Sequence, residues 1–294
     1  MGVRVGFTLQ PEERFLELCA PLLEEVDYFE LAPEVCWYAD DSGTLQPNGF
    51  HARFLNLAQR TGKPFVGHGV GFSLGTADRD PRRDERWLAA LERDQRLFDF
   101  QWYSDHLGAT VVDGHEVALP LPLPHTAEAE RTVRAALDAL ASVLPDVGFE
   151  NTAFPFWLDD PLEEADWITR LLEPADRHLV LDVHNLATNA ENAGFDPRAY
   201  ASRLPLDRVI EVHVSGGSAS DPAWLPSGRV LRLDSHDDAV PARVWALAEE
   251  LVPQCPGLRG VTLERMEGTV EERDVPVLRE ELRRARRLVE GARG

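Results

Sequence analysis

Short runs of hydrophobic residues alternate with longer amphipathic segments along the whole chain. The short runs are largely apolar, as expected for strands that are buried on both faces. Eight runs predict strands, over Val3–Thr8, Tyr28–Leu31, Pro64–His68, Trp102–His106, Gly148–Glu150, His178–Asp182, Val209–Val214 and Gly260–Glu264. The amphipathic segments predict helices over Glu12–Glu25, His51–Thr61, Asp84–Phe100, Ala127–Val143, Leu162–Leu172, Pro241–Leu251 and Glu271–Glu290.

This alternation of strands and helices predicts an α/β fold, a closed (β/α)8 TIM barrel. The chain has 294 residues, which is within the usual range for one such barrel, and no low-complexity linker divides it. We therefore expect one barrel domain over residues 1–294. An open doubly wound sheet is the alternative. It usually needs a glycine-rich phosphate turn after the first strand, and Gly6–Pro11 does not supply one.

The longest segments without a helical or strand pattern follow three of the predicted strands. They are Ala32–Asn48 after the second strand, Gly108–His125 after the fourth and Ser215–Asp238 after the seventh. Loops that follow strands lie at the C-terminal mouth of a β/α barrel, where these enzymes carry out their chemistry. The long loops are therefore predicted on the functional face.

Side chains that can bind metal ions stand at the ends of six successive strands. From the third strand to the eighth they are His68, His106, Glu150, Asp182, His213 and Glu264, and the loop after the seventh strand adds Asp234 and His236. Each residue alone is a weak signal, because a strand-end carboxylate often caps the next helix and a lone histidine is usually structural. Six consecutive strand ends at one rim predict a metal site.

Charge supplies the physical reason for this prediction. Several carboxylates in one cavity would repel one another and take up protons, and bound cations remove that cost. Imidazole and carboxylate donors without thiolate suit iron, manganese or zinc. This number of donors can hold two or three ions, and Glu150 is placed to bridge two of them.

The remaining polar motifs have plainer interpretations. Four histidines are expected to be structural or exposed: His51, His115, His125 and His178. His184 is ambiguous, because Asn185 competes for the same position after Asp182. Ser215–Ser218 is either an anion-binding turn or an ordinary one. The chain has no Gly-x-Ser-x-Gly elbow, which argues against a serine hydrolase.

The net charge and the cysteine content restrict the classes of binding partner and the cellular compartment that we expect. The formal net charge is −21 and the pI is near 4.8, so we expect no nucleic-acid partner and no anionic membrane surface as a partner. No apolar run approaches the length of about 20 residues that spans a bilayer. The cysteines, Cys19, Cys36 and Cys255, are odd in number and lack Cys-x-x-Cys spacing, which favours the reducing cytoplasm.

At its strand ends the sequence resembles the multinuclear non-heme iron-dependent oxidases, which are β/α barrels related to xylose isomerase and to metal-dependent apurinic endonucleases. The resemblance runs in order from the third strand to the eighth and covers most of the chain. The matching segments are His68–Gly75, Ser104–Leu107, Pro120–Pro122, Glu150–Asn151, Leu181–Asn185, Glu211–Gly216, Asp234–Val240 and Leu263–Glu264.

The resemblance implies a chemistry and a set of partners. Members bind two or three irons in a mixed-valent Fe(II)/Fe(III) cluster, use O2, and modify ribosomally made precursor peptides, commonly at cysteine. Many work with a small partner protein that recognises the leader of the precursor. The implied iron ligands are His68, His106, Glu150, Asp182, Asn185, His213, Asp234, His236 and Glu264, with Asn185 at a third ion. We expect Glu150, Asp182 and His213 to carry catalysis.

Two positions depart from the family pattern. Asp105 stands where the fourth-strand motif usually has glutamate, so a shorter carboxylate could withdraw a contact to a metal ligand. His184 stands where asparagine is more common, and it could add a ligand or fill space. Both departures leave iron binding as the expectation and put the detailed reaction in question.

Three other classes of function share parts of this pattern. A zinc or manganese phosphodiesterase of the apurinic endonuclease type would use nearly the same ligands, but the acidic charge opposes binding to a DNA backbone. A metal-dependent sugar isomerase would typically use a lysine, and the single lysine, Lys63, precedes the third strand, away from the mouth. A metal-free barrel that serves as a binding scaffold is the non-enzymatic alternative.

Overall fold

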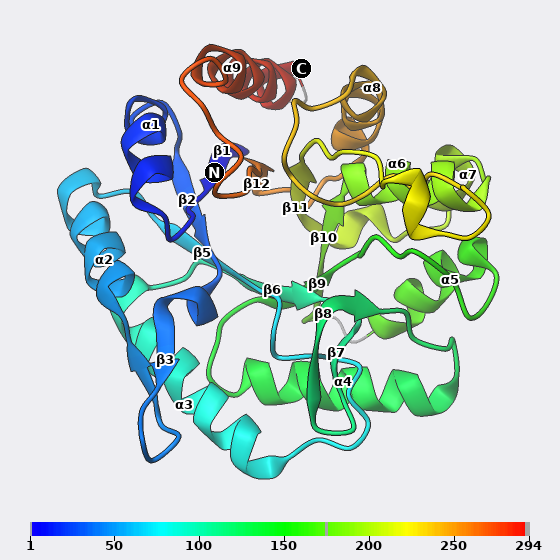
Figure 1. Cartoon of the computed structure of the whole chain (residues 1–294), viewed down its shortest axis with the longest axis horizontal. Coiled ribbons are helices and arrows are strands. Elements are labelled where there is room, and N and C mark those ends of the chain that lie inside the picture. The colour runs from blue at the N-terminus through cyan, green and yellow to red at the C-terminus, as the bar shows by residue number, and fades with distance from the viewer. Residues whose placement is uncertain (1, 174–175, 292–294) are drawn as a thin grey trace.

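The computed structural model describes residues 2–173 and 176–291, and it contains a closed barrel of eight parallel strands (Figure 1). The predicted fold class is confirmed. In order around the barrel the strands are β1 (Arg4–Thr8), β2 (Tyr28–Leu31), β5 (Phe65–Gly69), β6 (Tyr103–His106), β9 (Val147–Glu150), β10 (His178–Asp182), β11 (Val209–Val214) and β12 (Gly260–Leu263). β12 pairs with β1 and closes the ring.

Helices surround the barrel and bury their apolar faces against it (Figure 1). They are α1 (Glu13–Leu23), α2 (Gly49–Thr61), α3 (Pro81–Phe98), α4 (Ala127–Ala141), α5 (Pro161–Leu171), α6 (Val183–Ala193), α7 (Pro197–Ala201), α8 (Ala242–Leu251) and α9 (Val275–Gly291), with 3-10 turns η1 (Pro33–Cys36), η2 (Leu206–Arg208), η3 (Pro222–Trp224) and η4 (Val252–Gln254). Within the described ranges, no helix is long and apolar enough to cross a membrane.

Several helices begin where the sequence supplies a cap. Asp80 and Asp160 each accept a hydrogen bond from a backbone amide of the first turn, and a proline follows each of them at the first helical position. A capping carboxylate satisfies an amide that has no partner within the helix, and proline there loses no hydrogen bond. α3 therefore starts at Pro81, three residues before the predicted Asp84.

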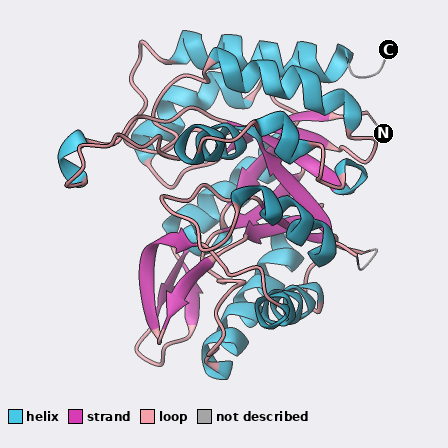
Figure 2. Cartoon of the chain, turned by 90° about the vertical axis from the view of Figure 1, so that its right-hand side faces the viewer, coloured by secondary structure: helices cyan, strands magenta, loops and turns pink. Residues whose placement is uncertain are grey.

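Two of the segments predicted without regular structure contain antiparallel ribbons. β3 (Trp37–Ala39) pairs with β4 (Leu45–Pro47), and β7 (Ala109–Val112) pairs with β8 (His115–Leu121). Asp113 and Gly114 form the tip of the second ribbon with φ of 52° and 72°, the left-handed backbone that Asp-Gly turns favour. Figure 2 shows strands of these ribbons projecting at the left, at the barrel end away from the N-terminus.

A layer of large side chains fills the barrel interior below its C-terminal mouth. Tyr28, Val66, Trp102, Val180 and Ile210 are buried and pack together. Glycines leave room for this layer, because a Cβ atom at Gly6 would lie 2.3 Å from the Tyr28 ring. Successive side chains of a strand point to opposite faces, so the residue two positions after a residue of this layer also points into the barrel. Glu30, His68 and Asp182 stand two positions after Tyr28, Val66 and Val180.

One buried carboxyl outside the barrel predicts a pH-dependent stability. Glu164 on α5 accepts a hydrogen bond from Tyr200 Oη at 2.8 Å, and burial raises the pKa of Glu164 from 4.5 to about 7. Between these values the native protein keeps a proton that the unfolded chain has lost, so its free energy of unfolding falls as pH rises. The full shift corresponds to about 3 kcal/mol.

Glu164→Gln is therefore expected to raise the melting temperature at pH 8 and to change it less at pH 5. Melting curves of both proteins over this pH range measure the difference, and the same replacement at the exposed neighbour Glu163 is the control. A difference in melting temperature that does not vary with pH would contradict the expected burial effect.

Candidate metal centre

The first group of donors comes from three strands on one side of the barrel. Nε2 of His106 lies 2.9 Å from Oε2 of Glu150, and Nε2 of His68 lies 3.3 Å from the same oxygen. The two Nε2 atoms are 3.1 Å apart. Nδ1 of His68 lies 2.8 Å from Ser104 Oγ, which fixes the ring and leaves its Nε2 facing the group. These three side chains could hold one ion.

The second group shares Glu150 with the first. Glu150, Asp182, His213 and Glu264 each offer one ligand atom, all within 4.8 Å of one another, and all four residues are buried. Nδ1 of His213 lies 3.3 Å from Glu264 Oε2 and 3.6 Å from Glu150 Oε1. Glu150 thus presents Oε2 to the first group and Oε1 to the second, which is the arrangement of a bridging carboxylate.

The start of α6 fixes Asp182 of the second group and places Asn185 beside it. Asp182 caps this helix, because its Oδ1 accepts the amide of Asn185 at 2.6 Å. Oδ2 of Asp182 is buried without a hydrogen-bond partner in the described structure. Nδ2 of Asn185 donates to Glu150 Oε1 at 3.3 Å, so the predicted residue Asn185 contacts the carboxylate that the two groups share.

Asp234 and His236 lie together at the edge of the centre. Nε2 of His236 is 2.6 Å from Asp234 Oδ1 and 3.8 Å from Glu264 Oε2, so Glu264 connects this pair to the second group. His236 has a φ of 49°, an unfavourable backbone conformation for a residue with a side chain. All nine predicted ligands are thus in one continuous cluster at the C-terminal rim.

The donor set fits bound cations. Buried ligand atoms without a hydrogen-bond partner in the described part of the chain gather here: Glu150 Oε2, Asp182 Oδ2, Asn185 Oδ1, His213 Nδ1, Asp234 Oδ1, His236 Nε2 and Glu264 Oε2. Leaving buried polar atoms unpaired costs free energy, which a shared cation would offset. The donors are nitrogen and oxygen, the set that suits iron, manganese or zinc.

The pKa values of the carboxyl groups reflect the many charges that lie close together in this cluster. Burial raises the pKa of Asp182 well above its ordinary value, and the charges of Glu150, Asp234 and Glu264 raise it further. Burial also opposes ionisation of Glu150, but the imidazoles of His106, His213 and His68 outweigh it and hold the pKa of Glu150 well below its ordinary value. Positive charge therefore stabilises this carboxylate.

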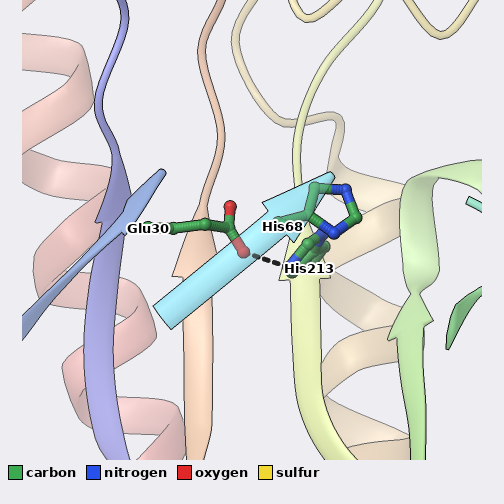
Figure 3. Close-up of side chains that lie close together, drawn as sticks. All are labelled: Glu30, His68 and His213. Carbon is green, nitrogen blue, oxygen red and sulfur yellow. Dashed lines mark ion pairs between the residues drawn. The ribbon is translucent and has the colours of Figure 1, made fainter. Parts of the chain in front are cut away.

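Sequence reasoning missed Glu30. Its side chain is fully buried, and its Oε2 lies 2.9 Å from Nε2 of His213 (Figure 3). Glu30, His68 and His213 form a third set of neighbouring donor atoms. The available signal was a charged residue inside a buried strand, Tyr28-Phe29-Glu30-Leu31, because buried carboxylates are rare without a partner.

The two positions that depart from the family pattern, Asp105 and His184, have different surroundings. Asp105 points out of the barrel interior, where its Oδ2 accepts the amide of Phe72 at 3.3 Å and burial raises its pKa to about 7. His184 is buried in the first turn of α6, with Nδ1 3.4 Å from Asp234 Oδ1. His184 therefore adjoins the edge of the centre, and Asp105 contacts a backbone amide near it.

The histidines expected to be structural or exposed lie outside this cluster. His51 is buried against Asp94, with Nε2 2.9 Å from the carboxylate, and His125 stacks on Trp167. His178 stands at the N-terminal end of β10, 3.8 Å from Asp146, and His115 is exposed on β8.

The chain also matches a defined protein family along nearly its whole length. Residues 4–290 match the family described as RiPP precursor modification enzyme MbnB/TglH/ChrH. The chain belongs to this family. Its relatives include UPF0276 proteins of Caulobacter vibrioides, 34% identical over 65% of each chain, and of Bordetella pertussis, 36% identical over 85% of this chain and 81% of the relative. The chain thus matches about two thirds of the Caulobacter relative's length.

Solved structures confirm the xylose-isomerase-like barrel. A D-tagatose 3-epimerase-like protein superposes with a TM-score of 0.60 at 14% identity, covering 99% of this chain and 100% of the other. Endonuclease IV from Thermus thermophilus superposes with a TM-score of 0.55 at 18% identity, covering 95% and 98%. At these identities the likeness extends to the fold alone.

Proposed function

We propose that the chain is a multinuclear non-heme iron-dependent oxidase that uses O2 to modify a ribosomally made precursor peptide, at cysteine. One observation carries the proposal. Six nitrogen and oxygen donors from successive strand ends meet in one largely buried cluster, joined by Asn185, Asp234 and His236 from the segments that follow, in a chain of the RiPP precursor modification family. An oxygen-rich site with imidazoles and a bridging carboxylate suits two or three redox-active irons.

The residues take distinct parts in this proposal. His68, His106 and Glu150 would hold one ion, and Glu150, Asp182, His213 and Glu264 would hold a second. Asp234 and His236 would hold a third, and Asn185 would assist from its contact with Glu150 Oε1. Bound iron would supply the reaction with O2. The chain's own contribution is to fix the donors by hydrogen bonds such as Ser104 to His68, and to keep the site buried.

The mouth of the barrel has the surface that a peptide substrate needs. Apart from Leu97 and Val277, the large exposed hydrophobic side chains of the described residues lie on segments that follow barrel strands: Val35, Tyr38, Val70, Val112, Leu119, Phe156, Leu158, Trp224, Val230 and Met266. Trp224 and Leu119 are the most exposed, at 65% and 63%. Apolar residues gathered at a functional face favour binding of an extended partner.

The apolar residues at the mouth of the barrel also indicate which binding partners to expect. The substrate would be a cysteine-bearing precursor peptide, and a small leader-recognition protein could present it. The strongly acidic chain favours a peptide over a nucleic acid or an anionic membrane, because its field repels phosphate.

Oxygen uptake by the reconstituted protein tests this function. Protein loaded anaerobically with Fe(II) is expected to consume O2 and change the mass of a cysteine-containing peptide encoded beside its gene. The same peptide with serine in place of cysteine is the control, and it should be unchanged. Iron-loaded protein that leaves the cysteine peptide intact, with zinc-loaded protein that cleaves abasic DNA, would replace oxidation with phosphodiester hydrolysis.

A further inference from the structure

Glu30 is held in one orientation inside the barrel. Thr8 Oγ1 donates to Glu30 Oε1 at 2.9 Å, which leaves Oε2 directed at His213 Nε2, 2.9 Å away (Figure 3). Both Oε2 and Nε2 are buried, and neither has a hydrogen-bond partner among the described residues, although the two atoms form an ion pair at 2.9 Å. The two atoms are therefore the closest polar partners available to each other.

The two nitrogens of His213 face different surroundings. Nδ1 faces Glu150 and Glu264 of the second metal group, and Nε2 faces Glu30 on the opposite side. A neutral imidazole has one N–H and one lone pair. If Nδ1 is to bind a cation, the proton must be on Nε2, where Glu30 can accept it.

Neighbouring contacts argue against two other roles. An ion bound between Glu30, His68 and His213 would need Nε2 of His68, which already faces His106 and Glu150, while Nδ1 of His68 contacts Ser104. Glu211 is also near His213 Nε2, at 3.7 Å, but its carboxylate accepts Tyr28 Oη at 2.7 Å and Trp102 Nε1 at 2.6 Å.

We propose that Glu30 is a positioning residue that acts through His213. It accepts the Nε2–H of His213, fixes the tautomer and ring orientation, and thereby directs the Nδ1 lone pair at the ion held with Glu150, Asp182 and Glu264. A carboxylate on the outer nitrogen of a metal-binding histidine makes the inner nitrogen a stronger donor, and its loss lowers metal affinity about 10- to 100-fold. This inference rests on the metal centre of the proposed function, but not on its oxidation chemistry.

Zinc binding to the full chain tests the inference without any turnover. The variants are Glu30→Gln, which keeps a weaker acceptor, and Glu30→Met, which has none. Chelator competition with Zn²⁺ is expected to show an affinity loss of about 10- to 100-fold for the methionine variant and a smaller loss for glutamine, with the same number of ions bound at saturation. Glu164→Gln, a buried glutamate remote from the cluster, is the matched control and should bind zinc as the unmodified chain does.

Nuclear magnetic resonance of the zinc-loaded protein reports on the hydrogen bond itself. With 15N-labelled histidine, we expect a strongly downfield, exchange-protected Nε2–H proton of His213 that moves upfield in both variants at position 30. Unchanged affinity and an unchanged resonance would overturn the role of Glu30 and leave the oxidase proposal intact. The loss of one whole ion at saturation would make Glu30 a ligand instead. An unmodified chain that binds neither zinc nor iron would overturn both proposals.

Discussion

Replacing Glu150 by glutamine is expected to reduce the metal content from two or three ions to below about one per chain, and to abolish peptide oxidation. Glu150 is the residue that the first and second groups share, with one oxygen toward each. An amide offers one neutral oxygen where the cluster needs a bridging anion, so both ions lose a ligand at once. Metal analysis after gel filtration and O2 uptake measure the two effects.

The melting temperature of the metal-free Glu150→Gln protein shows whether the variant still folds. Glutamine removes the charge that pairs with the imidazoles of His68 and His106, so metal-free Glu150→Gln should melt somewhat below the metal-free unmodified chain while still unfolding cooperatively. Glu164→Gln should keep its full metal content. A Glu150→Gln protein that retains all of its ions would show that this carboxylate does not bridge them.

Removing the metal ions from the unmodified protein is expected to lower its melting temperature by about 10 °C. Metal-free protein would keep Glu150, Asp182 and Glu264 in one buried space, and binding to the native state alone contributes about 4 kcal/mol when the free ion exceeds its dissociation constant about a thousandfold. For a chain of this size that energy corresponds to a shift of about 10 °C. Calorimetry before and after chelation measures it.

Restoring Fe(II) or Zn²⁺ should bring the melting temperature back. Asp182→Asn is a useful companion, because it removes one charge from the second group and should make the loss on chelation smaller. Equal melting temperatures with and without chelator, in protein shown by analysis to have lost its metal, would mean that the ions do not stabilise the fold.

The sequence was sufficient to predict the barrel because its strands are buried on both faces. Such strands appear as short apolar runs, and Tyr28–Leu31 and Val209–Val214 were predicted at their observed boundaries. α6 was not among the predicted helices. Nearly all its residues are buried, polar ones such as Asn185 and Thr188 included, so its polar positions do not mark a face exposed to solvent.

The candidate site was predictable to the extent that its residues end strands. His68, His106, Glu150, Asp182 and His213 could be placed on one rim from their positions in the chain, and the structure brings them together. Glu30 was not found this way, because it was counted within the apolar run Tyr28–Leu31. The Asp113-Gly114 turn was a local signal for the β7–β8 ribbon that was not used.

The most direct test of the account is the metal content of protein purified without oxygen from cells grown with ample iron. Elemental analysis with Mössbauer spectroscopy is expected to find two or three irons per chain in oxygen and nitrogen coordination, with both Fe(II) and Fe(III) present after brief exposure to O2. A correctly folded preparation that carries no iron, zinc or manganese when all three were supplied would contradict the claim that these strand-end side chains hold shared cations.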